Sequence, residues 1–342
     1  MTVQRLLFLW LCHVLIWLTA SSGASAQSNQ LIASFDSCPL QNGAAITSCQ
    51  IGYRTYGHLN ADKSNAVLIP TWYGGTSAGH AYLATAEYID PAAYFIIIID
   101  AIGNGVSSSP SNSTTQPGAE FPVFSIADIV TTQYRLLTET LSINKVYATV
   151  GLSMGAMQTL QWAIQYPDFT TRYAAITGTP HLPSFDIVRW STRNLLLQWY
   201  LACQCQQPLE IMVGLQLMGS IPAALSEDVP REDVEAHITA QAQKISLTQG
   251  EVFNQIRQAQ AMMNHNIAAA FNNDMHAAAA AIEGKLLIIT GADDRVVTPE
   301  PIKQLATMKQ STLIELDKDC GHGDPWCDPA SFSQALHRFL EN

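Results

Sequence analysis

The sequence predicts an α/β fold, with a mostly parallel central sheet flanked by helices and a helical cap insertion. Short apolar runs recur along the chain with helical patterns between them, and one long stretch interrupts this alternation with helical composition alone. Alternating strands and helices build a parallel sheet that helices cover on both faces. The chain has 342 residues and is 48% hydrophobic, so we expect one large domain with a full core.

The first expected strand covers residues 50–58, where apolar and polar residues alternate as in an antiparallel strand. The next expected strands are short apolar runs, typical of buried parallel strands, at residues 66–69, 95–99, 146–150 and 286–290. Helical patterns lie between these runs, at residues 126–141 and 154–165. We expect the last strand and the C-terminal helix at residues 314–316 and 330–340.

The alternation stops between about residues 180 and 276. This stretch contains three helical segments and no convincing strand; the segments are residues 190–201, 212–218 and 241–263. The strand pattern resumes at Lys285. We therefore expect a helical insertion that caps the sheet.

Residues 1–26 have the pattern of a secretory signal peptide. Arg5 precedes an almost wholly apolar run at residues 6–20, and Ala24-Ser25-Ala26 fits the small-x-small cleavage rule. A membrane anchor is the alternative, but the run is short for a membrane span and a small, polar stretch follows it. We therefore expect a periplasmic or secreted domain, residues 27–342, that has no membrane partner after cleavage.

Charge argues against nucleic acid as a partner. Cleavage after residue 26 leaves 16 Lys and Arg against 28 Asp and Glu, a net charge of −12. Such an acidic chain without a basic run is a poor partner for nucleic acid or anionic lipid.

Six cysteines remain after the signal peptide, and an even number in an exported chain suggests disulfides. Spacing favours the pairs Cys38–Cys49 and Cys320–Cys327. The other two, Cys203 and Cys205, either pair with each other or stay reduced. A zinc site would need two Cys-x-x-Cys pairs or well-placed histidines, which the sequence lacks, so we expect no metal.

The segment GLSMG at residues 151–155 places Ser153 between two glycines. Alone this pattern is weak, since most such segments are ordinary turns. Here a β-type run, residues 145–150, leads into it and a helical pattern follows, so Ser153 is expected on a sharp turn between a strand and a helix. That placement is the nucleophile elbow of the α/β-hydrolase fold.

A serine nucleophile needs a base and an acid, which follow it along the chain in this fold. Asp294 comes after the strand at residues 286–290 and is the expected acid, with Asp293 as the alternative. His322 lies between two glycines just before the C-terminal helix and is the expected base. Other histidines are expected at the surface or in the core, although the cap residues His265 and His276 could contact substrate.

An oxyanion hole needs two hydrogen-bond donors. The backbone N–H of Met154, directly after the nucleophile, is the first candidate. The second should come from the loop after the strand at residues 66–69, which reads PTWYGGT. We expect the Tyr73 N–H there, with Trp72 as the alternative, although this segment could also be a plain turn.

Residues 121–168 resemble the homoserine O-acetyltransferase-like branch of the α/β-hydrolases. The resemblance rests on Ser-Met-Gly followed by Met-Gln, then Gln-Trp-Ala and Tyr-Pro-Asp, and on IDAIGNGVSSSPSN at residues 99–112. It covers about residues 50–180 well, and residues 285–340 only through the acid and histidine loops. It implies an α/β-hydrolase fold with Ser153 as nucleophile, Asp294 as acid and His322 as base.

The resemblance also implies an arginine that holds a substrate carboxylate, for which Arg189 and Arg193 are candidates. We expect Trp72 and Arg193 to contact substrate. Acetyl-CoA is cytoplasmic, so an exported enzyme would more readily use water, and the sequence predicts a secreted serine hydrolase that cleaves a small-molecule ester without a cofactor. The alternatives are an O-acetyltransferase and a non-catalytic binding protein on a hydrolase scaffold.

Overall fold

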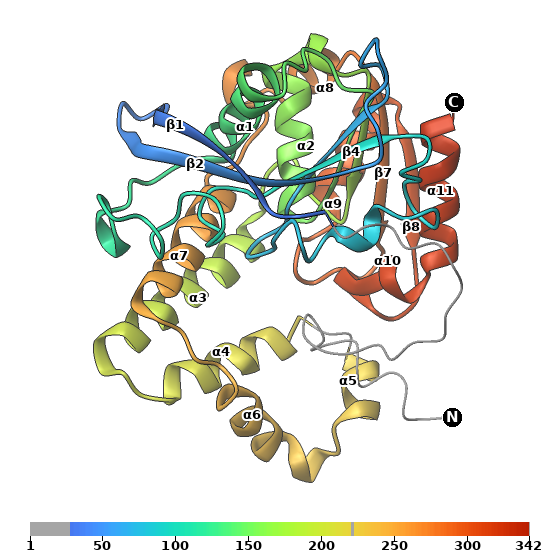
Figure 1. Ribbon diagram of the computed structural model, residues 1–342. Helices are drawn as coiled ribbons and strands as arrows, with labels where there is room; N and C mark the ends of the chain where they lie inside the picture. Colours follow the sequence, from blue (N-terminus) through green and yellow to red (C-terminus); the bar gives the residue numbers. More distant parts are fainter. Residues whose placement is uncertain (1–27, 220–221, 342) are drawn as a thin grey trace.

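The computed structural model describes residues 28–219 and 222–341, so the predicted signal peptide at residues 1–26 lies outside the described residues. Within the described residues, an eight-stranded sheet forms the centre of the molecule, and the predicted α/β architecture is confirmed (Figure 1). The strands lie in the order β1-β2-β4-β3-β5-β6-β7-β8. Strands β1, β2 and β4 pair antiparallel, and all other neighbours pair parallel.

The strands are β1 (Leu31–Pro39), β2 (Ala45–Tyr56), β3 (Ala66–Pro70), β4 (Phe95–Ile99), β5 (Ala148–Leu152), β6 (Arg172–Ile176), β7 (Lys285–Gly291) and β8 (Thr312–Leu316). The helices before the cap are α1 (Ile126–Arg135), which continues as the π-helix η3 (Leu136–Thr140), and α2 (Met154–Gln165). After the cap come α9 (Glu300–Lys309), α10 (Asp324–Cys327) and α11 (Pro329–Glu341).

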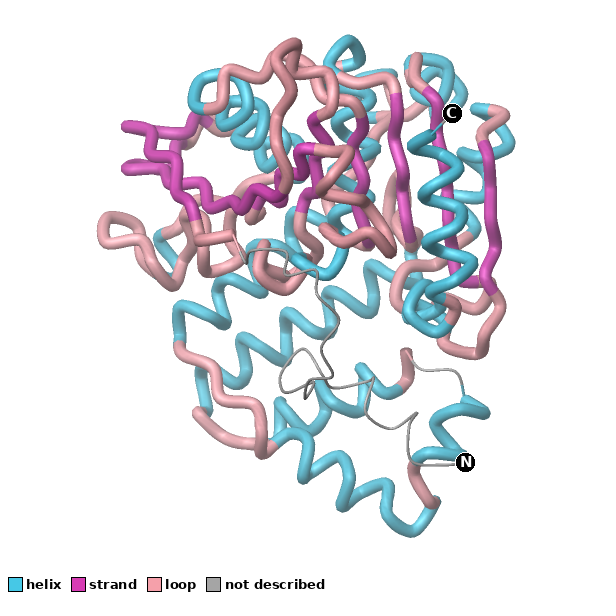
Figure 2. The backbone as a smooth tube through the Cα atoms, turned by 45° about the vertical axis from the view of Figure 1, so that its right-hand side comes forward, coloured by secondary structure: helices cyan, strands magenta, loops and turns pink. Residues whose placement is uncertain are grey.

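Among the described residues, six α-helices lie between β6 and β7: α3 (Ser184–Cys203), α4 (Gln207–Leu217), α5 (Pro222–Asp228), α6 (Val234–Ala242), α7 (Gln249–Met263) and α8 (Met275–Ala281). Helices α3, α4, α6 and α7 share a small apolar core of their own, which includes Leu197, Met212 and Ile256. They lie at one end of the strands in Figure 2. Among the described residues, no helix is both long and apolar enough to span a bilayer.

The sheet is buried on both faces because successive residues of a strand point to opposite sides. In β3, Leu68 belongs to the core that includes residues of α1, α2, α8 and α9, whereas Val67 and Ile69 belong to the core that includes residues of α11. Helix α11 therefore lies on the opposite face of the sheet from α1, α2, α8 and α9 (Figure 1). This burial explains why the central strands read as continuous apolar runs.

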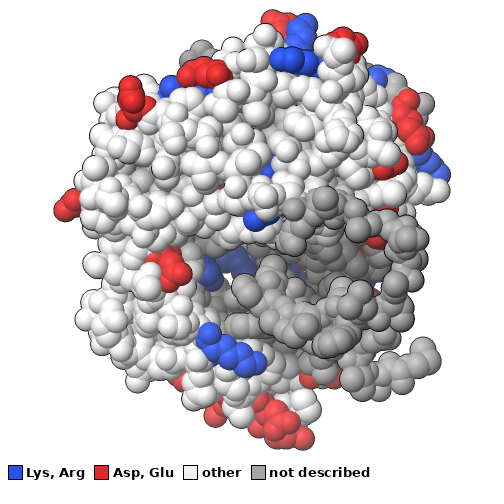
Figure 3. All heavy atoms as spheres, viewed as in Figure 1, with Lys and Arg blue, Asp and Glu red and all other residues white. Residues whose placement is uncertain are grey.

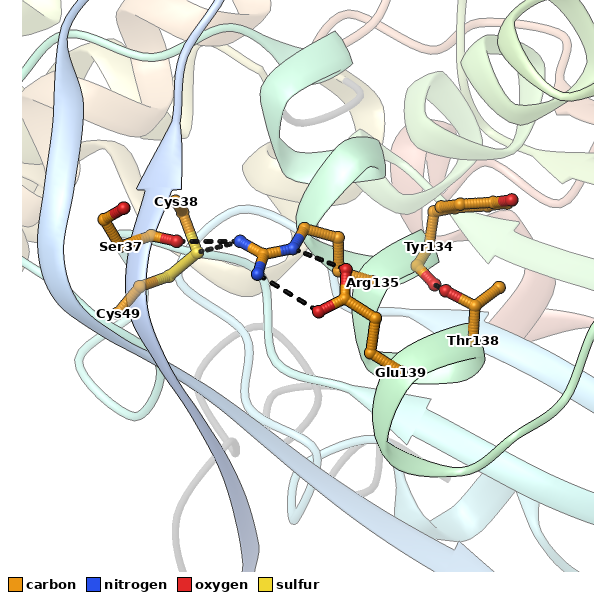
Figure 4. A network of polar contacts seen from close by, with 7 residues as sticks. All are labelled: Ser37, Cys38, Cys49, Tyr134, Arg135, Thr138 and Glu139. Carbon is orange, nitrogen blue, oxygen red and sulfur yellow. Dashed lines mark hydrogen bonds and ion pairs between the residues drawn. A yellow bond between two sulfur atoms is a disulfide. The ribbon is translucent and has the colours of Figure 1, made fainter.

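The N-terminal hairpin is attached to α1 (Figure 4). The Cys38–Cys49 disulfide links its two strands. Arg135 on α1 donates through Nη1 to the Ser37 carbonyl oxygen at 2.7 Å and pairs through Nε with Glu139 at 2.9 Å. The bond from Arg135 to Ser37 therefore links the edge of the sheet to its first helix.

Several element predictions are confirmed within one or two residues, and helix 154–165 matches α2. The strand expected at residues 146–150 instead begins at Ala148. The Val146 N–H donates to the Phe169 carbonyl oxygen, which lies outside the hydrogen-bond ladder of the sheet. The helix expected to reach residue 141 changes to π-type after Arg135. Strands β1 and β6 were not expected.

Candidate active site

Ser153 lies on the turn between β5 and α2. Its backbone has φ 55° and ψ −121°, a conformation that side-chain-bearing residues rarely adopt. The Ser153 N–H donates to the Ile176 carbonyl oxygen at the end of β6, at 2.8 Å. Such strain persists only where the surrounding structure holds it, and it concentrates at functional sites.

The glycines on either side of Ser153 allow close backbone contact. A Cβ atom on Gly151 would lie 2.0 Å from the Gly155 carbonyl oxygen, and a Cβ on Gly155 would lie 2.5 Å from the Pro70 carbonyl oxygen. Both distances are far inside van der Waals contact. The Gly-x-Ser-x-Gly pattern is therefore needed for the turn itself and for the approach of α2 to the end of β3.

Ser153, His322 and Asp294 form a hydrogen-bonded network, although they lie on three separate loops. His322 Nε2 is 3.1 Å from Ser153 Oγ, and His322 Nδ1 is 2.6 Å from Asp294 Oδ2. The Asp294 side chain is fully buried, and 22% of the His322 side chain is exposed. With its Nδ1 proton donated to Asp294, His322 presents an Nε2 lone pair to the serine hydroxyl.

The loop between β7 and α9, residues 292–299, which we call the acid loop, places its two aspartates differently. Asp294 Oδ1 accepts hydrogen bonds from the N–H groups of Val296 and Val297, at 2.8 and 2.9 Å, and this leaves Oδ2 for His322. Asp293 is exposed. Of the two aspartates that the sequence left open, Asp294 is therefore the one that contacts the histidine.

His322 lies in the short helix η7 (Gly321–Gly323), which the Cys320–Cys327 disulfide brackets. The Cys320 N–H donates to the buried carboxylate of Asp324 at 2.9 Å. Burial raises the pKa of Asp324, and the backbone bond from Cys320 opposes this shift. The loop that carries the histidine is thus held by a covalent link and by a buried acceptor.

The expected oxyanion donors come from two segments. Met154 is the first residue of α2, so its N–H has no partner within the helix. The Trp72 N–H donates to His80 Nε2 at 3.2 Å, which removes it as the alternative oxyanion donor. No hydrogen bond between described residues uses the Tyr73 N–H.

The cap contacts the loop at residues 71–80, which lies between β3 and the short 3₁₀ helix η1 (Ala81–Leu83) and which we call the β3–η1 loop. The Tyr73 hydroxyl donates to the Gln255 carbonyl oxygen on α7 at 3.2 Å, and the Gly74 N–H donates to Gln258 Oε1 at 2.7 Å. The Tyr73 and Trp190 rings also lie 4.9 Å apart, so α3 joins this contact. The cap therefore packs directly on the segment that follows β3.

The two residues expected to contact substrate lie at this loop. Arg193 on α3 donates to Gln255 Oε1 at 2.8 Å, and its guanidinium lies 5.8 Å from the Tyr73 ring centroid. The Trp72 ring packs against His80, with ring centroids 3.7 Å apart. Their contact with substrate remains a prediction.

Arg189, the other arginine suggested by the resemblance, lies one helical turn before Arg193 on α3. Burial and the positive charge of Arg193 lower the pKa of Arg189, whereas Asp186 and Asp294 favour its charged form. Figure 3 shows a hollow between the sheet domain and the cap, with Lys and Arg atoms visible inside it. Positive charge therefore lies in this hollow, in an otherwise acidic molecule.

Three residues near the site were not singled out as functional by sequence reasoning. Buried Asp186 accepts bonds from the N–H and hydroxyl of Thr298, which ties α3 to the acid loop. His80, the last residue of the β3–η1 loop, accepts a bond from the Trp72 N–H, and Gln258 on α7 accepts one from the Gly74 N–H. No local pattern marks these residues, because each acts on a segment distant in sequence or on a backbone group.

Both undecided cysteines are joined, in a Cys203–Cys205 disulfide at the end of α3. Among the described residues, no group of three or more His, Cys, Asp and Glu side chains could hold a metal ion. The site therefore consists of a serine, an imidazole, a carboxylate and nearby backbone donors, the set of groups used for acyl transfer.

The sheet order and the strand–serine–helix turn define an α/β-hydrolase fold, and the family model described as alpha/beta hydrolase fold matches residues 67–199. The chain therefore has the α/β-hydrolase fold, and its sequence is similar to those of homoserine O-acetyltransferases. An acetylester hydrolase from Corynebacterium glutamicum superposes with a TM-score of 0.81 at 26% identity, over 94% of this chain and 98% of the other.

Two sequence relatives match over shorter lengths. The ethyl acetate hydrolase of Pseudomonas veronii is 44% identical over 153 residues, which is 44% of each chain. The homoserine O-acetyltransferase of Zymomonas mobilis is 36% identical over 165 residues, 41% of this chain and 42% of that protein. The chain thus matches less than half the length of these two relatives.

Proposed function

We propose that this chain is a serine hydrolase that cleaves carboxylic esters with a small acyl group. The observation that carries the proposal is the network from Ser153 Oγ through His322 to Asp294, with the serine on a strained turn. The names of the relatives, an ethyl acetate hydrolase and an acetylester hydrolase, support ester bonds and short acyl groups.

The reaction proceeds in two halves. Ser153 Oγ attacks the ester carbonyl carbon while His322 Nε2 takes the hydroxyl proton, and Asp294 stabilises the imidazolium. The N–H groups of Met154 and Tyr73 donate to the oxyanion that forms. The C–O bond to the alcohol breaks as His322 returns the proton, and the acyl group stays on Ser153.

Water then completes the cycle. His322 takes a proton from a water molecule, whose oxygen attacks the acyl carbon. The bond from this carbon to Ser153 Oγ then breaks as His322 returns the proton to the serine, and the carboxylic acid leaves.

We also propose that the mature chain acts in the periplasm or outside the cell. The signal-peptide pattern of residues 1–26 and the three disulfides support export. Outside the cytoplasm, water rather than acetyl-CoA is the available co-substrate.

The test is hydrolysis of p-nitrophenyl acetate by the purified chain and by Ser153→Ala. We expect the variant to lose about 10⁴-fold or more in kcat, as serine triads do when the nucleophile is removed. Ser331→Ala, at an exposed serine of α11, is the matched control and should keep wild-type activity. Equal activity of wild type and Ser153→Ala would refute the proposal.

The same experiment includes the transferase alternative. Acetyl-CoA and homoserine are added in place of the ester, and free CoA thiol is measured. Release of CoA that depends on both Ser153 and homoserine, without ester hydrolysis, would identify an O-acetyltransferase instead. A chain that neither reacts nor binds a fluorophosphonate at Ser153 would be a non-catalytic binding protein.

A further inference from the structure

His80 is a buried histidine that the proposed reaction does not use. Its side chain is inaccessible to solvent at the end of the β3–η1 loop, the loop that carries Tyr73. Its ring bonds back to the backbone of that loop at two places. The ring either only fills the core or also fixes the direction of the Trp72 and Tyr73 N–H groups.

The two bonds determine which nitrogen carries the proton. A backbone N–H can only donate, so the Trp72 N–H at 3.2 Å requires an unprotonated Nε2. Nδ1 is 2.9 Å from the Thr76 carbonyl oxygen, which can only accept, so Nδ1 holds the proton. His80 is therefore a neutral imidazole with both ring nitrogens in use.

The environment of the ring favours this neutral form. Burial lowers the pKa of His80 to about 4, and the bond to the Thr76 carbonyl opposes the shift only in part. The Trp72 ring packs against the imidazole at 3.7 Å between centroids. A Cβ atom on Gly75 would lie 2.8 Å from the imidazole ring and 2.6 Å from the indole ring, so the loop closes tightly around both.

Trp72 and Tyr73 present consecutive N–H groups, and only one of them is engaged. His80 accepts the first, whereas no hydrogen bond between described residues uses the second. Two further contacts fix the ends of this turn. The Gly74 N–H donates to Gln258 at 2.7 Å, and the Ser77 N–H donates to buried Asp100 at 2.6 Å.

We propose that His80 is a positioning residue, whose imidazole binds the Trp72 N–H so that the following Tyr73 N–H serves as the second oxyanion donor. This inference rests on the proposed function, because it assigns a role within the same reaction. His80 touches neither substrate nor the reacting atoms. Its effect is on the stabilisation of the transition state, and so on kcat rather than on KM.

Two amide substitutions separate the two ring bonds. In His80→Gln the side-chain oxygen can take the place of Nε2 and accept the Trp72 N–H. In His80→Asn the shorter side chain can take the place of Nδ1 and donate to Thr76, but it leaves the Trp72 N–H without its acceptor. Both variants are neutral and polar. If His80 only filled core volume, any difference in kcat between His80→Gln and His80→Asn would come with a matching difference in stability.

The expected result is a difference between the variants in kcat for p-nitrophenyl acetate. His80→Gln should stay within about threefold of wild type, and His80→Asn should lose about tenfold to a hundredfold, less than the complete loss of an oxyanion donor. KM should stay within about twofold in both. Equal losses in the two variants, or losses that appear in KM alone, would overturn the proposal.

A second measurement needs neither variant to fold nor any substrate. Ring ¹⁵N chemical shifts of the wild-type chain at pH 7 report which nitrogen of His80 is protonated. The proposal requires a proton on Nδ1 and none on Nε2; a proton on Nε2 would overturn it. A wild-type chain without esterase activity would refute the proposed function, while the ring measurement would still decide whether His80 accepts the Trp72 N–H.

Discussion

Gly155 lies where α2 meets the end of β3, and replacing it with alanine tests whether this contact shapes the site. The new Cβ atom would lie 2.5 Å from the Pro70 carbonyl oxygen, whereas ordinary contact begins near 3.4 Å. The obstacle is backbone and cannot rotate away. Helix α2 or the start of the β3–η1 loop must therefore move by almost 1 Å.

Gly214 on α4 provides a matched control. It is also a helical glycine, and a Cβ atom there would meet nothing within 4 Å. Gly214→Ala should stabilise the chain by about 0.5–1 kcal/mol through helix propensity and reduced freedom of the unfolded chain. Gly155→Ala shares part of this gain but adds an overpacking cost of about 1–3 kcal/mol, so it should be the less stable variant by roughly that amount.

The assays are urea unfolding at pH 7 with the disulfides intact and hydrolysis of p-nitrophenyl acetate. Gly155→Ala should lose about tenfold to a hundredfold in kcat, because a shift near 1 Å misplaces the oxyanion donors relative to Ser153. Gly214→Ala should keep wild-type kcat. If Gly155→Ala is as stable and as active as the control, the close approach of α2 to β3 does not shape the site.

Two further predictions concern the acid and the base loop. Asp294→Asn should lower kcat by about 10⁴-fold while the chain stays folded, because the amide can still accept the Val296 N–H but holds the imidazole in the wrong tautomer; exposed Asp293→Asn is the control, and a similar loss there would contradict the assignment. Replacing both Cys320 and Cys327 with serine should lower stability by about 2.5 kcal/mol, from the closed loop between them. An unchanged unfolding midpoint in thermal melts would show that this link does not hold the loop.

The sequence alone determined the elements whose signals are local. An apolar run, a Gly-x-Ser-x-Gly turn and a helical pattern follow one another directly, so the strand, Ser153 and α2 could be predicted together. The order of acid and histidine after the serine also follows from the chain. Strand β6 gave a weaker signal, because Ala174 and Ala175 have low strand propensity and are recruited by pairing with β5 and β7.

Tertiary structure decided which candidate residues meet. Asp293 and Asp294 are neighbours in sequence, and only the fold of their loop buries one beside His322 and exposes the other. His80 has no motif, because its partner is a backbone N–H that becomes available only when the β3–η1 loop closes. Periodicity and spacing report local geometry, whereas burial and hydrogen-bond direction depend on segments that are distant along the chain and become neighbours only in the folded protein.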